Sequence, residues 1–146
     1  MTHHLTFPGW EQRERSVCRH IINAAFATHI NLGGPGLLER VYERALCLEL
    51  TKRKIPYRRQ VYLPLKYLDE TLNENHVLDL IVDERVIVEI KAFERDHPVH
   101  LAQLRTYLRQ AGLTYGLLIN FGKIRILEGI AYVVQRGWRG QSRGRK

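Results

Sequence analysis

The chain has 146 residues, 45% hydrophobic and 26% charged, which is ordinary for a soluble globular protein and long enough for one domain with a real core. Its formal net charge of +8 favours a polyanionic partner, most often nucleic acid and more rarely an anionic membrane surface. No apolar run approaches about 18 residues and no signal peptide is recognisable, so we expect a cytoplasmic protein without a membrane span. Cys18 and Cys47 stand apart, which excludes a C-x-x-C zinc or redox motif.

The first half of the chain predicts a flexible arm over residues 1–10, then two helices and a strand. The first helix spans about residues 11–31, and Gly33-Gly34-Pro35-Gly36 ends it. The second helix spans about residues 37–54. Its predicted core face consists of Leu38, Val41, Ala45 and Leu48. Residues 57–67 alternate as a strand, in which Pro64 indicates an edge position, and residues 68–75 predict a polar connection.

The second half of the chain predicts a charged hairpin over residues 77–91 and then a helix–strand pair. Pro98 suits the first turn of a helix that Gly112 ends, and the apolar run 114–121 is typical of a strand buried on both faces. Shorter strands near residues 124–127 and 130–134 could extend the sheet. The boundaries that we expect are a domain over residues 11–134 and a basic, disordered tail over residues 135–146.

The order of these elements predicts an α/β fold. Its core is helix–three strands–helix–strand (α-β-β-β-α-β) with an extra N-terminal helix, giving a four-stranded mixed sheet flanked by helices on both faces. A strand–helix–strand crossover is right-handed and makes its strands parallel, so the strand at 114–121 should run parallel to the strand at 86–92.

Charges interrupt the hairpin where its pattern calls for hydrophobic residues. Asp79 interrupts the first strand, while Glu89 and Lys91 lie two residues apart on one face of the second. Asp79 joins that face if Val82 pairs with Val86 around a three-residue turn; a two-residue turn would place the carboxylates on opposite faces. We favour the three-residue turn, because it gathers all three charges.

Two carboxylates and a lysine at one point suit metal-assisted hydrolysis of a phosphodiester. Carboxylate oxygens bind Mg²⁺, which keeps waters and substrate phosphate as its other ligands, while an ammonium can orient the attacking water or offset developing charge. The alternative is a hairpin in which Lys91 merely neutralises Glu89, because D-x9-E-x-K is a short and permissive spacing.

Other candidates come from the helices. Glu39, with Tyr42 on the same side of the second helix, could supply a third carboxylate, or could be a solvated glutamate. Gln103 and Tyr107 stand four residues apart on the third helix, off its leucine stripe, and could line the site or simply lie at the surface. His76 should face away from Asp79. No P-loop or Ser-His-Asp arrangement is supported.

The residues G36-L-L-E39-R-V-Y42, V-L-D79-L-I-V and V-E89-I-K91-A resemble the bacterial GxxExxY proteins of the PD-(D/E)XK nuclease-like superfamily. The resemblance covers about residues 15–134 and implies a restriction-endonuclease-like core. It also implies that Asp79 and Glu89 bind metal with Glu39 as an auxiliary ligand, that Lys91 positions or activates the water, and that Gln103 and Tyr107 complete the pocket like the Q-x-x-x-Y of RecB-like nucleases.

We therefore expect a Mg²⁺-dependent nuclease, with Mn²⁺ as a substitute, that acts on DNA rather than RNA. Tyr107, Tyr42, Arg139 and Arg143 are the candidate substrate-binding residues; the basic tail that holds the two arginines could equally be a solubilising end. The alternative is a nucleic-acid-binding or protein-interaction module on the same fold with catalysis lost. The sequence leaves a homodimer open.

Overall fold

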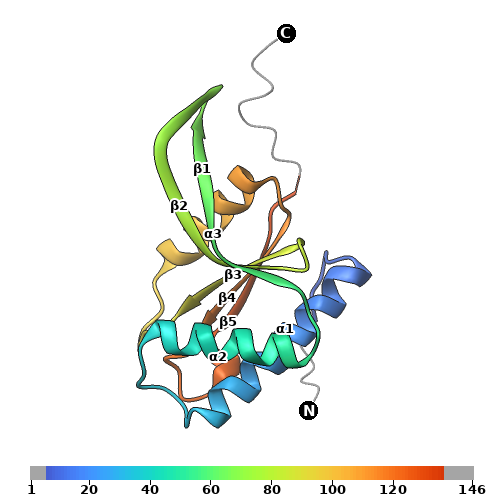
Figure 1. Cartoon of the computed structure of the whole chain (residues 1–146), viewed down its shortest axis with the longest axis vertical. Helices are drawn as coiled ribbons and strands as arrows, with labels where there is room; N and C mark the ends of the chain where they lie inside the picture. Colours follow the sequence, from blue (N-terminus) through green and yellow to red (C-terminus); the bar gives the residue numbers. More distant parts are fainter. Residues whose placement is uncertain (1–5, 137–146) are drawn as a thin grey trace.

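A computed structural model describes residues 6–136, in which one mixed sheet has the strand order β1-β2-β3-β4-β5 (Figure 1). All neighbours are antiparallel except β3 and β4, which are parallel, as the crossover rule predicts. The strands are β1 (Tyr57–Tyr67), β2 (Glu70–Val82), β3 (Val86–Lys91), β4 (Tyr115–Asn120) and β5 (Ile130–Val134). The α/β prediction is confirmed, but the sheet has five strands and not four.

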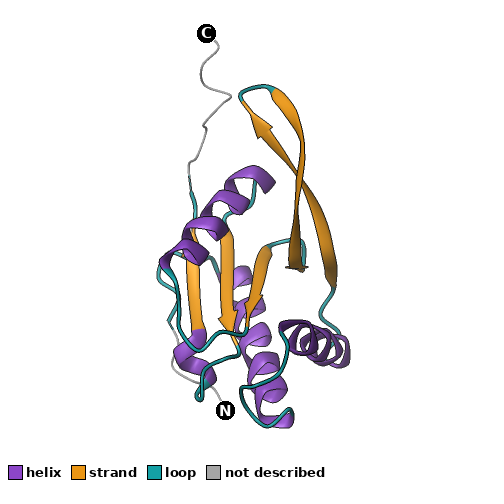
Figure 2. Ribbon diagram, turned by 90° about the vertical axis from the view of Figure 1, so that its left-hand side faces the viewer, coloured by secondary structure: helices purple, strands orange, loops and turns teal. Residues whose placement is uncertain are grey.

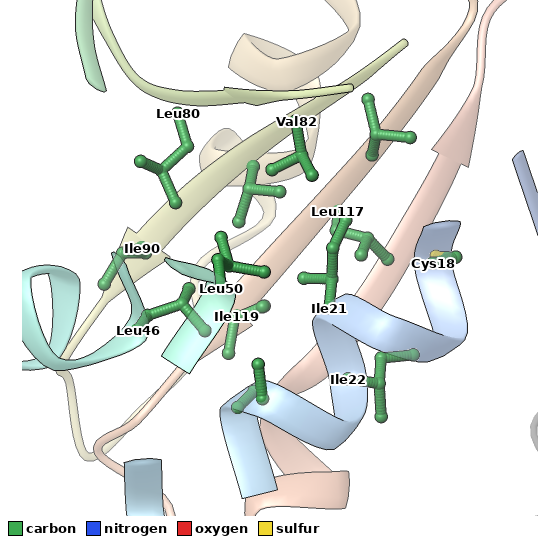
Figure 3. Packing of buried hydrophobic residues seen from close by; sticks show 14 of the residues in the cluster. Cys18, Ile21, Ile22, Leu46, Leu50, Leu80, Val82, Ile90, Leu117 and Ile119 are labelled. Atoms are coloured by element: carbon green, nitrogen blue, oxygen red, sulfur yellow. The ribbon is translucent and has the colours of Figure 1, made fainter. Parts of the chain in front are cut away.

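Helices cover both faces of the sheet (Figure 2). Helices α1 (Gln12–Asn31) and α2 (Glu39–Lys52) pack on one face, and α3 (Pro98–Ala111) packs on the other. In the larger core, Ile21 of α1 and Leu50 of α2 pack in one cluster with Leu117 and Ile119 of β4 (Figure 3). None of the helices in the described residues is long and apolar enough to cross a membrane.

The chain before α1 is part of the core in the described residues. Phe7 and Trp10 are buried, and both rings contact Tyr132 of β5. The Trp10 ring also lies 4.6 Å from the ring of Tyr115. Burial of large aromatic side chains contributes strongly to stability. The expectation of a flexible arm over residues 1–10 is therefore revised for residues 6–10.

The α3 boundaries follow local rules. His97 caps the helix because its Nδ1 accepts the N–H of Val99, and Pro98 occupies the first turn. Gly112 ends the helix in the left-handed conformation, with φ of 70°. After β4, the segment expected as a strand near residues 124–127 instead leads into a short 3-10 helix (Ile126–Gly129), whereas the strand at 130–134 is present.

Helix α2 presents a different face to the core from the one that its sequence predicted. Leu48 is 65% exposed and Leu38 is also exposed, although both belong to the predicted stripe. The buried face is shifted round the helix. Its members are Tyr42, Glu43, Leu46, Cys47 and Leu50. The correction matters for function, because this rotation buries a glutamate.

Strands β1 and β2 are longer than β3 and extend beyond the sheet as a two-stranded ribbon (Figure 1). The edge position that Pro64 indicated is confirmed, because β1 is the first strand of the sheet. The polar connection expected over residues 68–75 is wrong: β2 begins at Glu70, and Tyr67 pairs with it across a tight turn. Tyr67, the last residue of β1, is exposed.

Candidate active site

The β2–β3 hairpin has the three-residue turn that gathers its charges. Val82 pairs with Val86 and Leu80 with Val88, which places Asp79 opposite Glu89. At that point side chains replace the backbone ladder: the N–H of Ile90 donates to Asp79 Oδ2 at 2.8 Å, and the N–H of Asp79 donates to Glu89 Oε1 at 3.2 Å. The predicted convergence of Asp79 and Glu89 is confirmed.

The backbone ladder between β2 and β3 does not continue to Asp79. Backbone pairing of β2 with β3 ends at Leu80, while β2 continues into the ribbon. Groups on both sides of the sheet interact electrostatically with Asp79: Glu39 and Glu43 do so from α2, and Tyr107 does so from α3. Lys91, the last residue of β3, interacts with both hairpin carboxylates.

Burial dominates the electrostatics of this cluster. Glu89 is 6% exposed, and burial, reinforced by the charge of Asp79, raises its pKa to about 8. Burial also raises the pKa of Asp79, against the lowering effect of the Ile90 N–H, and the charge of Glu43 raises it further. The pKa of Glu39 is raised by burial, although Lys91 opposes the shift. The single positive charge of Lys91 therefore does not compensate for the burial and mutual repulsion of Asp79, Glu89 and Glu39.

Aromatic rings lie on the α3 side of the candidate site. Tyr107 is buried, and burial followed by the charges of Glu89 and Asp79 raises the pKa of its hydroxyl. The His76 ring stacks on the Tyr107 ring at 3.9 Å. The pKa of His76 and of His100 is lowered first by burial and then by Lys91. Tyr107 therefore lines the site. His76, which we expected to face away from Asp79 and to lie outside the site, contacts Tyr107 at its edge.

The remaining candidates fall in different places. Gln103 is exposed on α3, near enough to His100 to act on the pKa of its ring, so it lies at the outer side of the site. Tyr42 cannot bind substrate, because its side chain is fully buried: its ring stacks on Phe121 at 4.8 Å and its hydroxyl donates to the carbonyl of Gly34 at 2.7 Å. Tyr42 instead fixes the glycine-rich loop to α2. Arg139 and Arg143 lie outside the described residues.

Glu43 and Gln60, which both lie near Asp79, were not among the site residues predicted from the sequence. Glu43 of α2 is 5% exposed, and the Nε2 group of Gln60 donates to its carboxylate oxygens at 2.8 and 3.0 Å. Arg59 forms an ion pair with the same carboxylate. The signal that could have revealed Glu43 is a charged residue on the Tyr42–Leu46–Leu50 stripe, had that stripe been taken as the core face.

The donor set suits a divalent cation that needs few protein ligands. Within residues 6–136, no three His, Cys, Asp or Glu side chains are grouped closely enough to hold a metal ion by themselves. Buried Glu89 and half-buried Asp79 nevertheless form a pair whose mutual repulsion a cation would relieve. Mg²⁺ commonly binds one or two carboxylates and keeps waters and substrate phosphates as its other ligands. The pair fits such a site.

A comparison with protein families agrees with this geometry. A family model described as the PD-(D/E)XK nuclease superfamily matches residues 15–133. The chain belongs to the PD-(D/E)XK nuclease superfamily. Nucleases of this superfamily generally use divalent metals and act on nucleic acid, and the mixed sheet flanked by helices fits their restriction-endonuclease-like core. Neither the curated proteins nor the solved structures gave a match.

A prediction about pH follows from the raised pKa values. Between the ordinary glutamate pKa of 4.5 and about 8, the folded chain keeps a proton on Glu89 that the unfolded chain has lost. Stability without metal should therefore fall as pH rises from about 5 to about 8, because the folded state binds more protons. Melting temperatures in EDTA test this, and Glu89→Gln should flatten the dependence. An equal slope in both proteins would contradict the assignment.

Proposed function

We propose that this chain is a Mg²⁺-dependent nuclease of the GxxExxY group that hydrolyses phosphodiester bonds in DNA, in the cytoplasm. The observation that carries the proposal is the pair of buried Glu89 and half-buried Asp79 with Lys91 beside it, at the point where β2 leaves β3. A salt-bridged hairpin without chemistry would be expected to balance its charges, whereas here burial and repulsion raise the pKa of both carboxylates.

The residues divide the work by their chemistry. Asp79 and Glu89 would hold the metal, with Glu39 as an auxiliary ligand or water-binding group. When bound, the metal would supply Lewis-acid polarisation of the phosphate and lower the pKa of the attacking water. Lys91 donates to that water and offsets the negative charge that develops on the phosphate oxygens. Tyr107 closes the α3 side of the pocket and Gln103 its rim. As the water oxygen bonds to phosphorus, the P–O bond on the opposite side would break, with the water's proton passing to solvent and solvent protonating the leaving oxygen.

The direct test is incubation with labelled single-stranded, duplex and branched DNA and with RNA, in Mg²⁺, Mn²⁺ or EDTA. Cleavage that requires metal supports the nuclease, and the preferred substrate identifies the nucleic acid. The second candidate is a binding module on the same fold with catalysis lost, favoured by the net charge of +8. Binding without cleavage in any metal would support that module. Whether a homodimer forms can be measured on the same samples.

The basic end of the chain gives a prediction about binding. Deleting residues 137–146 removes Arg139, Arg143, Arg145 and Lys146. If these side chains neutralise phosphates, the slope of log affinity against log salt should fall by up to about 3 to 4, because each contact contributes about 0.9 on duplex DNA. Arg136 stays in the truncated chain because its guanidinium donates to the Tyr115 hydroxyl at 2.8 Å. An unchanged slope would show that the basic residues of 137–146 do not contact phosphates and only make the chain more soluble.

A further inference from the structure

Gln60 lies where the ladder between β1 and β2 is interrupted. Arg59 pairs with Leu80 and Val61 with Leu78, so Gln60 lies opposite Asp79. Its φ is 52°, a left-handed backbone conformation that is uncommon for a residue other than glycine. Such conformations persist only where surrounding contacts enforce them, and they are enriched at functional sites. The contacts of the Gln60 side chain indicate what this conformation serves.

The side-chain amide of Gln60 lies between two carboxylates. Its Nε2 donates to both oxygens of Glu43, at 2.8 and 3.0 Å, and the amide lies close enough to the Asp79 carboxylate to lower the pKa of that group. A glutamine amide has two N–H donors, so one nitrogen can serve both partners. The carboxylate of Asp79 thus accepts the Ile90 N–H from β3 and has the Gln60 amide beside it from β1, where Gln60 stands opposite Asp79.

Glu43 holds the other end of this connection. A buried carboxylate is costly unless it is paired and hydrogen-bonded, and Glu43 meets both conditions through adjacent residues of β1. Arg59 Nε lies 2.9 Å from Glu43 Oε1, and Gln60 donates to the same group. The three side chains fasten the edge strand to α2 directly beside Asp79.

We propose that Gln60 is a positioning residue that fixes the orientation of the Asp79 carboxylate for metal binding, with Glu43 and Arg59 as its anchor. The inference deepens the proposed function and rests on it. Groups that hydrogen-bond to metal-binding side chains set their orientation, and losing one typically lowers metal affinity or activity about 10- to 100-fold. A purely structural role for Gln60 would change stability and leave metal affinity in the folded protein as it was.

The test is Gln60→Met, which keeps the length of the side chain and removes its donors. We expect Mg²⁺ and Mn²⁺ affinity, measured by calorimetry on the full chain without DNA, to fall about 10- to 100-fold. Cleavage at limiting metal should fall by a similar factor. DNA affinity in EDTA should stay within about twofold, because Gln60 acts through Asp79. Metal affinity equal to wild type would overturn the inference.

Gln110 provides a matched control. It also fastens β1 to a helix, since its Oε1 accepts the N–H of Lys66 at 3.0 Å and its Nε2 donates to the carbonyl of Lys66 at 3.1 Å. Gln110→Met removes these bonds from the other side of the strand, away from Asp79. We expect unchanged metal affinity. An equal loss in both variants would show that general loosening of β1 is responsible.

Glu43→Gln tests the anchor and guards against a Gln60 variant that fails to fold. The glutamine still offers a carbonyl to Gln60, so metal affinity should fall less than in Gln60→Met, and the double variant should be no weaker than Gln60→Met alone. Additive losses would overturn the anchor, because Glu43 would then act on the metal independently. If the wild-type protein neither binds metal nor cleaves, the proposed function fails. If the wild-type protein does both and Gln60→Met binds metal equally well, only this inference fails.

Discussion

Lys91→Ala should abolish cleavage while metal binding persists. Lys91 ends β3 beside both hairpin carboxylates, and its charge opposes the rise in their pKa. Its removal deletes the cation that positions the water and offsets charge on the phosphate, an effect for which a single donor is typically worth about 10²- to 10³-fold in rate. The carboxylates remain and lose their competing counter-ion, so Mg²⁺ should bind at least as tightly.

The measurement combines a cleavage assay at saturating metal with calorimetric titration of the metal. Lys52→Ala, which removes the same charge from the exposed end of α2, is the control and should cleave normally. Lys91→Arg keeps the charge but changes its geometry, and we expect it to restore little of the rate. If Lys91→Ala cleaved at the wild-type rate, Lys91 would have no role in the chemistry.

The centre of this site could be predicted from sequence because burying charge is costly. Strand alternation and the apolar surroundings of Asp79, Glu89 and Lys91 left few arrangements for them, and the three-residue turn was the one that brought them together. The parallel pairing of β3 with β4 followed from the helical crossover that joins them. These features depend on local pattern, which a single sequence displays directly.

The contribution of α2 depended on packing that the pattern left open. Two stripes of the helix are apolar at helical spacing, one through Leu38 and Leu48 and another through Tyr42, Leu46 and Leu50. Periodicity cannot choose between them, because the choice is made by contacts with α1 and the sheet. The core uses the second stripe. As a result Tyr42 becomes a buried structural residue and Glu43 joins the cluster.

His76 was misplaced because β2 does not alternate regularly through Asp79. Leu78 packs in the α3-side core and Leu80 in the core beneath α1 and α2, although regular alternation would put both on one face. The strand therefore rotates between them, at the residue opposite the left-handed Gln60. His76 keeps the face of Leu78 and reaches Tyr107. Only the long-range pairing of β1 with β2 shows this rotation.

Asp79→Asn should weaken metal binding and cleavage together, which distinguishes it from the lysine variant. The introduced amide would keep an oxygen to accept the Ile90 N–H, so the local backbone should be retained. The variant would lose the charge that binds the cation, and we expect metal affinity to fall at least about 10- to 100-fold and cleavage to fall below detection. DNA binding in EDTA should stay equal or become tighter, because a charge that repels phosphate is gone.

Asp83→Asn is the matched control, because it makes the same change in the turn of the same hairpin. Asp83 pairs with Arg13 and Arg85, away from the carboxylate cluster, so this variant should bind metal and cleave as wild type does. The stability of Asp79→Asn in EDTA should equal or exceed that of wild type at about pH 8, since relieving a crowded acidic pair removes repulsion from the folded state. If wild type binds DNA but cuts nothing in any metal, and both Asp79→Asn and Lys91→Ala bind DNA as it does, the carboxylate pair is a remnant and the binding module replaces the nuclease.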